Sequence, residues 1–299
     1  MSDTLIQTDR PRVSLREVDA HTRRRRGRSS LARILLSLGM VVAIVPLALI
    51  LAEVTRRGLP ALDWEFLTQI QPGARRDGGG YVHGIIGSAY MVGFATLVSV
   101  PVGILAAIYL TEYGRGWLPR IIRFFTDVMT GVPSVFVGLF IYALLVRGAF
   151  GFGAIVGAAG LAVLMLPIIV RSSEEMLKLV PEDQRAASIG LGARKWQTIM
   201  RVVLPSAAPG LVTGAMLAVA RAAGETAVLL LTALGSLQVV SQLQGTPIAS
   251  LTLLIYRGAR QPFPAGQQRA WAGALLLMLI VLVLTLAARF VTARWGNRR

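Results

Sequence analysis

The sequence predicts an all-α polytopic membrane protein with six transmembrane helices and with both termini in the cytoplasm. Hydrophobic residues make up 54% of the 299 residues, charged residues only 15%, and the mean hydropathy is +0.62. A soluble globule of this length needs far more polar surface than that. Two further observations predict the topology. The lengths of the apolar stretches indicate the number of spans, and the positions of the basic residues indicate their orientation.

Six apolar segments are long enough to cross a bilayer. The hydrocarbon core is about 30 Å thick and takes about 20 apolar helical residues to span. Each segment is bounded by charged residues, glycine or proline. The predicted spans are residues 34–52, 84–111, 128–146, 148–170, 207–235 and 270–288. Only Arg147 and a glycine-rich bend separate the third span from the fourth, so this hairpin is expected to be tight.

The basic residues set the orientation of the spans, because cytoplasmic loops collect positive charge. With the N-terminus inside, most of the 31 Lys and Arg residues fall on the inner side, and Arg221 alone lies within a predicted span. The run 23-RRRRGR-28 is then a topology anchor beside anionic lipid, and nucleic-acid binding is the weaker alternative. A long charged tail precedes the first apolar segment, so no cleavable signal peptide is expected.

The spans divide the chain into four regions. Residues 1–27 form a basic cytoplasmic tail without apolar periodicity, which predicts disorder. Residues 28–83 hold the first span and an exterior loop, residues 84–292 form the core, and residues 293–299 form a second cytoplasmic tail. The exterior loops 53–83 and 236–269 are rich in Gly, Pro and Gln and have room for short interfacial helices.

The longest interior segment, 171-RSSEEMLKLVPEDQRAASIGLGARKWQTIMRVVLP-205, carries apolar residues at helical spacing. Pro181 predicts the start of a new helix, since its missing N–H is unpaired at that position anyway. Gly192 divides this helix from the next, because glycine tolerates positive φ and close backbone approach. Short helices of this kind suit docking to another protein. The alternative is a helix pair that merely lies on lipid.

Two charges, Arg221 and Glu225, lie inside the fifth predicted span. A charged side chain at a helix centre costs about 2.5–3.5 kcal/mol on insertion scales, so such residues normally face a wet cavity or a partner. The two residues are one helical turn apart and can pair, which lowers this cost. A purely structural ion pair, or a shorter span with Arg221 reaching outward, are the alternatives. Arg171, at the inner end of the fourth span, is either a second contact for a solute or an interfacial anchor.

The sequence also lacks the residues that several kinds of chemistry need. It has no cysteine and two histidines, His21 and His83, so no metal site is predicted. Neither lysine, Lys178 or Lys195, lies in a G-x-x-x-x-G-K-[ST] loop, so the chain is not expected to bind ATP. No Ser-His-Asp or paired-carboxylate set lies in the spans, so we expect no catalytic residue, no cofactor of its own and no enzyme activity.

The interior segment resembles the cytoplasmic coupling loop of ATP-binding-cassette importer permeases, whose motif is E-A-A-x-x-x-G followed nine residues later by I-x-L-P. The chain departs from the motif at Ala186, where the family usually has Glu, at Ser188 for the second Ala, and at Val202 for Ile. Losing the Glu puts in question the salt bridge that it would make to the ATPase. The positions that correspond to the coupling loop are Ala186, Ala187, Ser188, Gly192, Ala193, Leu204 and Pro205.

Further stretches resemble one branch of that family, the A-type permeases of phosphate-specific importers. At Val228 that branch commonly has Pro, so a milder helix kink is expected there. The resemblance covers roughly residues 84–290. The stretches are 100-VPVGILAAIYLTEYGRG-116, 131-GVPSVFVGLFIYALLV-146, 165-MLPIIVRSSEEMLKLVP-181, 219-VARAAGETAVLLLTALG-235 and 250-SLTLLIYRGARQPFPAGQQRAWAGALLL-277.

The resemblance implies a type I importer permease fold and a place in the bacterial inner membrane. The chain would form half of a pathway for inorganic phosphate, with a sister C-type permease as the other half. ATP and Mg would be used by a partner ATPase dimer docked under the coupling loop, and an extracytoplasmic phosphate-binding protein would deliver the cargo. Membrane lipid is the remaining partner, and no nucleic acid is expected.

The resemblance also implies roles for the three charged residues. Arg221, Glu225 and Arg171 are expected to line the anion pathway, since a guanidinium offers planar, bidentate donors to an oxyanion. Glu225 would hold Arg221 and moderate its field, so that the anion can leave again. The rival functions are a permease for another small oxyanion and, less favoured, a self-sufficient secondary transporter or a membrane scaffold. A secondary transporter should show repeat symmetry and several midplane acids, and the sequence shows neither.

Overall fold

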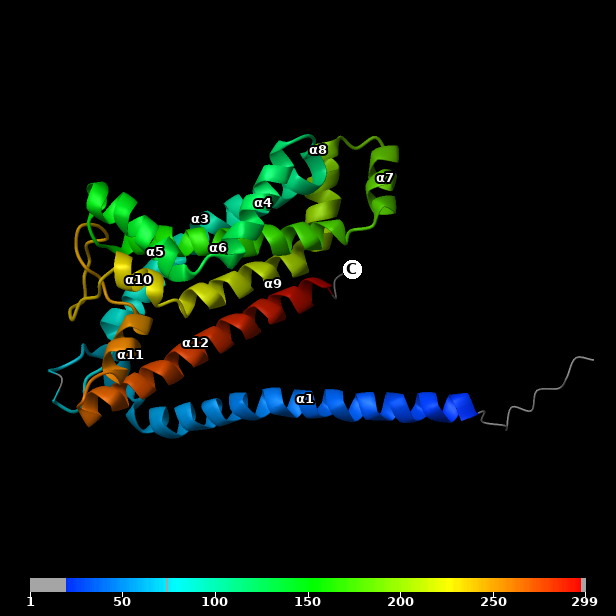
Figure 1. The fold of residues 1–299 in the computed structure, drawn as a ribbon. Helices are drawn as coiled ribbons and strands as arrows, with labels where there is room; N and C mark the ends of the chain where they lie inside the picture. Colours follow the sequence, from blue (N-terminus) through cyan, green and yellow to red (C-terminus); the bar gives the residue numbers. More distant parts are fainter. Residues whose placement is uncertain (1–19, 74, 297–299) are drawn as a thin grey trace, which may run out of the picture. The chain divides into compact units, whose positions relative to one another are not determined.

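The computed structural model describes residues 20–73 and 75–296, and this part of the chain consists of helices and loops. The chain divides into two units, residues 1–53 and 54–299. The helices, in chain order, are α1 (Ala20–Gly58), η1 (Leu59–Ala61), α2 (Trp64–Thr68), α3 (Val82–Ile108), η2 (Tyr109–Tyr113), α4 (Leu118–Gly131), α5 (Ser134–Ile141), η3 (Tyr142–Phe150), α6 (Ala154–Lys178), α7 (Glu182–Gly190), α8 (Lys195–Thr198), η4 (Ile199–Val203), α9 (Leu204–Ala223), α10 (Ala227–Thr232), α11 (Leu251–Ala259) and α12 (Pro264–Gly296) (Figure 1).

The first predicted span is the central part of α1. This helix begins at Ala20, so residues 20–27 of the predicted disordered tail are helical, and this part of the prediction is wrong. Residues 1–19 lie outside the described residues. The helix is continuous through the basic run because arginine is a good helix former, and sequence polarity alone does not break a helix.

The second unit is built on close contacts among the long helices. Helix α6 packs against α3 and α9, and α9 packs against α12 (Figure 1). Small residues allow these approaches: a Cβ on Gly157 would lie 2.6 Å from Met91 Sδ, and one on Gly103 would lie 2.6 Å from Ile169 Cγ2. Glycine contacts of this kind are typical of helices that pack within membranes.

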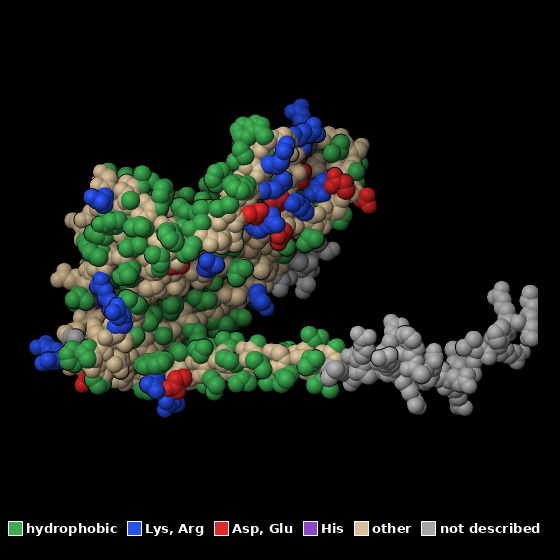
Figure 2. Space-filling model, viewed as in Figure 1, with side chains coloured by type: hydrophobic (Ala, Val, Ile, Leu, Met, Phe, Trp, Pro, Cys, Tyr) green, Lys and Arg blue, Asp and Glu red, His purple; other side chains and the backbone are tan. Residues whose placement is uncertain are grey.

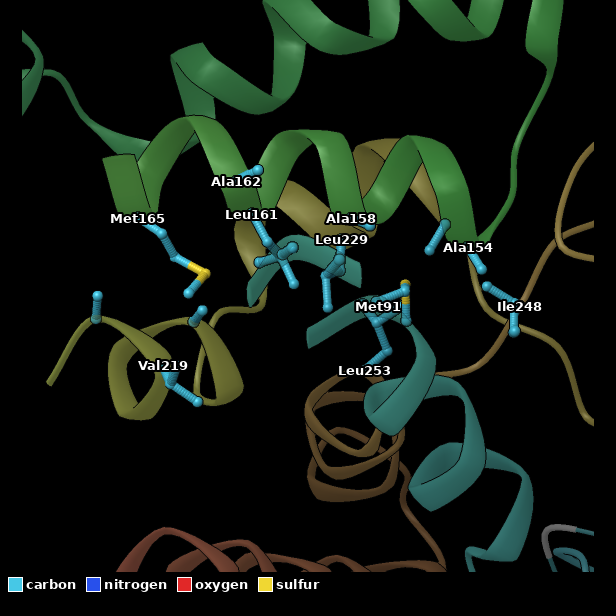
Figure 3. Packing of buried hydrophobic residues seen from close by; sticks show 14 of the residues in the cluster. Met91, Ala154, Ala158, Leu161, Ala162, Met165, Val219, Leu229, Ile248 and Leu253 are labelled. Atoms are coloured by element: carbon cyan, nitrogen blue, oxygen red, sulfur yellow. The ribbon is translucent and has the colours of Figure 1, made fainter. Parts of the chain in front are cut away.

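The main hydrophobic core of this unit lies where α3, α6, α9 and α10 meet. Met91 from α3 and Leu229 from α10 lie close together against α6, near Ala158 and Leu161 (Figure 3). Ile248 and Leu253 close the core from the loop before α11 and from α11 itself. The core therefore fixes α10 and the start of α11 next to the C-terminal half of α9.

Within residues 20–73 and 75–296, five helices or helix runs are long and apolar enough to cross a membrane, and a bent pair gives up to a sixth. The third predicted span, 128–146, is not one straight helix. Helix α4 ends at Gly131, and α5 with η3 begins at Ser134, at 108° to α4. Pro133 causes the break, since proline cannot donate a backbone hydrogen bond and excludes the helical conformation at Val132, where ψ is 127°.

Two other predicted spans differ at their ends. The fourth begins at Ala154, after the bend at Gly151 (φ 65°), and continues to Lys178, beyond the predicted end at 170. The fifth runs from Lys195 to Ala223 and stops there, twelve residues before the predicted end at 235. The remaining apolar residues of that stretch form the short helix α10. The predicted continuous fifth span is therefore wrong at its C-terminal end.

Both long loops contain short helices, as predicted, and their predicted exterior position stays a prediction. The 53–83 loop contains η1 and α2, and the 236–269 loop contains α11. Pro181 is the residue before α7, and Gly192, with φ 87°, lies between α7 and α8. The resulting short helices α7 and α8 lie together at one end of the second unit, and α11 lies at the other end (Figure 1).

Candidate functional site

The break between α9 and α10 gives Glu225 a backbone contact that was not predicted from the sequence. Glu225 Oε1 accepts the Ala227 N–H (3.0 Å), so the carboxylate caps the start of α10. Thr252 Oγ1 donates to the Glu225 carbonyl oxygen (2.9 Å) and ties the break to α11. Because α9 ends at Ala223, Arg221 and Glu225 do not share a continuous helix, and the predicted pairing one turn apart is wrong.

Arg221 is exposed in the last turn of α9. Among the described residues, no acidic side chain and no hydrogen-bond acceptor lies within bonding distance of its guanidinium. A charge inside a membrane-spanning helix is costly unless it meets water, a partner or a ligand. The arginine is therefore available to a group that this chain does not itself supply.

Contacts between α6 and α9 locate Arg221 relative to Arg171. A Cβ on Gly210 would collide with Met176, and one on Gly214 with Ser172, so the two helices run antiparallel. Arg221 lies two turns beyond Gly214 on the same side of α9. Arg221 is therefore on the same side of α9 as the glycines that contact α6, and α6 is the helix that carries Arg171.

Arg171 itself is paired. Its Nε lies 3.3 Å from Glu175 Oε1 and its Nη1 lies 3.8 Å from Asp127 Oδ1 on α4, and all three side chains are exposed. It lies two turns before the end of α6 and not at the helix end that the sequence predicted. The structure thus brings Arg171 and Arg221 onto the same helix pair but gives only Arg171 a partner.

A group of hydroxyl side chains near the break was missed by sequence reasoning. Ser250 Oγ accepts the Leu253 N–H (3.1 Å) at the start of α11 and lies 3.0 Å from Thr252 Oγ1. Ser88 Oγ, from α3, accepts the Leu251 N–H (2.8 Å). Serine before an apolar run is a signal for a helix start, so Ser250 could have been identified. Ser88 could not, because its partner is far away in the sequence.

The residues predicted to form the coupling loop lie on α7, in the following turn and at the start of α9. Ala186 is exposed on α7, and Ser188 Oγ lies 3.0 Å from Thr198 Oγ1 on α8. The Ala193 N–H donates to the Ser188 carbonyl oxygen (3.2 Å) across Gly192. These bonds hold α7 and α8 as one unit. Leu204 and Pro205 are the first two residues of α9. That these residues together form one docking unit stays a prediction, and its members are Ala186, Ala187, Ser188, Gly192, Ala193, Leu204 and Pro205.

An open groove of about 630 Å³ runs along this unit. Leu191, at the tip beside Gly192, is 90% exposed. Ile189 on α7 and Trp196 on α8 are also more than half exposed. Exposed apolar surface beside polar residues is typical of a site that a partner covers. The residues lining the groove are Gln184, Ala187, Ser188, Leu191, Gly192, Ala193, Gln197, Arg201 and Val202.

A network of charged side chains around Arg185 and Glu112 was also not predicted from the sequence. Arg185, 14% exposed, lies 3.2 Å from Glu112 Oε1 and donates to the Val180 (2.6 Å) and Leu177 (2.8 Å) carbonyl oxygens. Lys195 donates to the Glu112 carbonyl oxygen. Glu112 belongs to the π-helical turn at the end of α3. The network therefore connects α7 and α8 to a membrane-spanning helix.

A second network of charged side chains joins α4, α6 and the π-helical turn after α3. Glu174, 1% exposed on α6, accepts from Arg123 Nε on α4 (2.8 Å) and from Lys178 Nζ (2.6 Å). Arg123 Nη2 also donates to the Leu110 carbonyl oxygen (3.0 Å) in the π-helical turn. In Figure 2, most of the visible acidic side chains of the second unit, and many of the basic ones, lie at the end that carries α7 and α8, and further basic side chains lie at the opposite end. Within the described part of the chain, no group of three or more His, Cys, Asp and Glu residues could hold a metal ion.

This arrangement of spanning helices, a broken helix and an exposed helical loop agrees with a family comparison. The model for the "binding-protein-dependent transport system inner membrane component" family matches residues 99–297. The chain belongs to this family. It is therefore a multi-pass component of the inner membrane, and its matched region includes α9, the break and the coupling loop.

Relatives of known name narrow the comparison to one branch. The phosphate transport system permease protein PstA of Haemophilus influenzae is 42% identical over 253 residues, which cover 84% of this chain and 89% of that protein. PstA of Yersinia pestis is 39% identical over 271 residues (90% and 92%). PstA 1 of Mycobacterium tuberculosis is 40% identical over 283 residues (91% and 92%).

Solved structures share the fold at lower identity. A bacterial alginate ABC transporter, in complex with an alginate pentasaccharide-bound periplasmic protein, has a chain that matches with a TM-score of 0.65 at 14% identity, covering 90% of this chain and 96% of that one. A chain of the MetNI methionine ABC transporter, in an inward-facing conformation, matches with a TM-score of 0.57 at 21% identity (72% and 95%). The predicted importer permease fold is confirmed.

Proposed function

We propose that this chain is the transmembrane permease subunit of an ATP-driven phosphate importer and forms half of its pathway with a sister C-type permease. Support comes from relatives about 40% identical over most of the chain, all named as phosphate transport permeases. The chain contains no phosphate-binding loop for ATP, so an ATPase dimer that uses ATP and Mg would supply the energy. A phosphate-binding protein would deliver the anion from outside.

The observation that carries this proposal is the exposed guanidinium of Arg221 inside a spanning helix, without a partner among the described residues. Arginine stays charged at any physiological pH and pairs side-on with two oxygens of an oxyanion. A cation already neutralised by a carboxylate would bind the anion more weakly. Arg221 is therefore the residue that we assign to contact phosphate during passage.

Glu225 and Arg171 are proposed as further residues of the pathway. Glu225 fixes the start of α10 directly after the break and places a negative charge close to Arg221 along the chain. That charge would weaken the hold of Arg221 on phosphate, so that the anion can leave. Arg171, already shared with Glu175 and Asp127, would give a weaker contact further along α6.

For the coupling loop we propose docking of the ATPase dimer at the groove along α7 and α8, with Leu191 inserted into the partner. The side chain at 186 is a methyl group that points into solvent, so the acidic contact usual for the family is absent there. Apolar contacts between Leu191 and the ATPase, together with the fit of the groove, would take the place of this acidic contact. This assignment places α7, α8 and both termini in the cytoplasm, in agreement with the distribution of basic residues.

Uptake of radiolabelled phosphate into ATP-loaded vesicles that contain the full complex tests the proposal. Arg221→Gln should abolish uptake while complex assembly stays normal, and Arg221→Lys should restore only part of it, because lysine lacks the planar fork. Arg120→Gln is the matched control: Arg120 is an exposed arginine at the start of α4, and its loss should leave uptake unchanged. Normal uptake by Arg221→Gln rejects the pathway role. Absence of ATP-dependent uptake by the unmodified complex rejects the phosphate importer.

A further inference from the structure

A small polar cavity lies far from the coupling loop, where α12 begins. Helix α12 starts beside α11 and runs toward the end that carries α7 and α8 (Figure 1). The cavity has a volume of about 160 Å³ and lies between the segment before α2, the Gly78–Gly79 turn and the first turns of α12. Its lining residues are Pro60, Ala61, Asp63, Asp77, Gly78, Gly79, Ala265, Gln268 and Arg269.

Arg269 is the basic residue among those that line this cavity, and it is only 3% exposed. Its Nη1 donates to the carbonyl oxygens of Arg76 (2.7 Å) and Gly78 (3.0 Å), which fixes the plane of the guanidinium. Its Nε and Nη2 are buried and have no acceptor among the described residues. These two nitrogens form the edge of the guanidinium that binds two oxygens side-on.

The carboxylates near the cavity do not accept hydrogen bonds from Nε or Nη2 of Arg269. Asp63 Oδ1 accepts the Phe66 N–H (2.8 Å) as the cap of α2, and Glu65 Oε1 accepts the Gly79 N–H (2.8 Å). Asp77 is exposed at the rim, and neither aspartate lies within ion-pair distance of Arg269. Burial raises the pKa of Tyr81 to about 12, and the positive charge of Arg269 opposes this rise. The charge of Arg269 is thus held in the interior without a counter-ion among residues 20–73 and 75–296.

A buried cation whose donors are unpaired is unfavourable, since desolvation of the charge is not compensated. Native structures seldom leave such donors empty, so the edge calls for an acceptor from outside the chain. Two parallel N–H donors match two oxygens of one oxyanion. The aspartates at the rim restrict the choice, because they repel an anion that cannot donate a hydrogen bond to them.

We propose that this cavity binds one protonated oxyanion of the hydrogen phosphate class, with two oxygens on the Nε and Nη2 edge of Arg269 and its hydroxyl donating to Asp77. The choice of phosphate rests on the proposed transport function, whereas the need for an oxyanion rests on Arg269 alone. Gly78 and Gly79 have φ of 76° and 64°, conformations that favour glycine, and both residues line the cavity. Nε and Nη2 of Arg269 are buried, so a lining segment must move before an anion reaches them. In the proposed site, the anion enters by displacing the Gly78–Gly79 turn.

Hydrogen exchange of residues 75–80 tests the proposal without any transport step. The full complex is placed in nanodiscs without its binding protein, and inorganic phosphate or sulfate is added at equal ionic strength. Phosphate should slow exchange in this turn and sulfate should not, because sulfate is fully deprotonated at neutral pH. Asp77→Asn changes an exposed side chain, so it should fold normally. Its amide N–H₂ can donate to either anion, so phosphate binding should weaken about tenfold or more and the preference over sulfate should disappear.

Two further variants complete the test. Arg269→Lys keeps the charge but loses the side-on edge, so the phosphate effect should vanish, whereas Arg260→Gln, on the exposed end of α11, should leave it intact. Equal protection by both anions in the unmodified protein, or protection by neither, overturns the proposal. Protection that appears only when the anion-free binding protein is added also overturns it, because a carboxylate of that protein is then the acceptor. Phosphate uptake is measured separately, so failure of this site and failure of the transport function give different results.

Discussion

The end of the molecule that carries α7 and α8 and the break between α9 and α10 use charge in opposite ways. At the first, Arg123, Lys178 and Arg185 each contact a carboxylate, and two of them also bind carbonyl oxygens. At the second, Arg221 contacts no partner among the described residues, and Glu225 is used to cap a helix. Paired charges fix elements relative to one another, whereas an unpaired charge stays available to a ligand. The comparison predicts that stability and transport depend on different residues.

Among the charged residues of these two regions, Glu174 should give the largest loss of stability when it is replaced. Glu174→Gln leaves Arg123 and Lys178 without their shared counter-charge, and the amide is buried between α4 and α6. Both cations are partly exposed and regain water, so the expected loss is about 1–3 kcal/mol. The thermal midpoint of the purified complex in detergent should fall by several degrees.

Arg221→Gln is the matched control for this measurement. It also removes one charge from a spanning helix, but no contact within the described chain is lost, so the midpoint should stay unchanged. If the two variants lose similar stability, Arg221 has a structural partner and the contrast between the two regions is wrong.

Arg185→Lys should reduce coupling more than stability. Lysine keeps the charge, but it cannot contact Glu112 and the carbonyl oxygens of Leu177 and Val180 at once. The link between α7 and α3 then loosens, and the number of phosphate ions moved per ATP hydrolysed should fall about fivefold.

The control for coupling is Arg120→Lys, at an exposed arginine without a partner among the described residues. Its ratio of transport to hydrolysis should equal that of the unmodified complex. An unchanged ratio in Arg185→Lys would mean that the network holds the loop in place without transmitting its motion.

Val228→Pro should have the smallest effect. Val228 is the second residue of α10, where a backbone N–H has no acceptor within the helix, so proline is tolerated. Some packing against Gly160 is lost, since a Cβ there would lie 2.5 Å from Val228 Cγ1. The expected change in unfolding free energy is within about 1 kcal/mol, measured by thermal unfolding.

Leu217→Pro, at an exposed position within α9, is the comparison and should cost about 3 kcal/mol. A large loss in Val228→Pro would show that α9 and α10 behave as one helix. The break would then be weaker than the structure indicates.

The number of spans and the short helices that follow Pro181 could be predicted from the sequence. Apolar length and backbone-restricting residues are local properties, and both can be read without knowing neighbours. The same reasoning failed at 128–146 and 207–235, where hydropathy continues across a break in the helix. Pro133 is visible in the sequence, but proline also occurs inside membrane-spanning helices, so its position alone does not show that a helix ends there.

The polar networks could not be predicted, because their members are far apart in the chain. Glu112 and Arg185 meet only because α3 and α6 pack side by side. The capping role of Glu225 depends on where α9 stops, and Gly224 alone does not determine that. Arg221 was found because a single arginine in an apolar stretch is a local anomaly. Its proposed role in the pathway stays a prediction.

The 108° bend at Pro133 has a consequence for the biosynthesis of this protein. Helix α4, with 14 residues, is about 21 Å long, and α5 with η3 is only slightly longer, so neither arm alone reaches across the about 30 Å hydrocarbon core. Both arms pack on α6, which is synthesised after them. During insertion the bent segment must therefore remain shielded by the insertion machinery or by earlier helices until α6 emerges. The order in which helices leave the ribosome thus determines when this part of the fold can form.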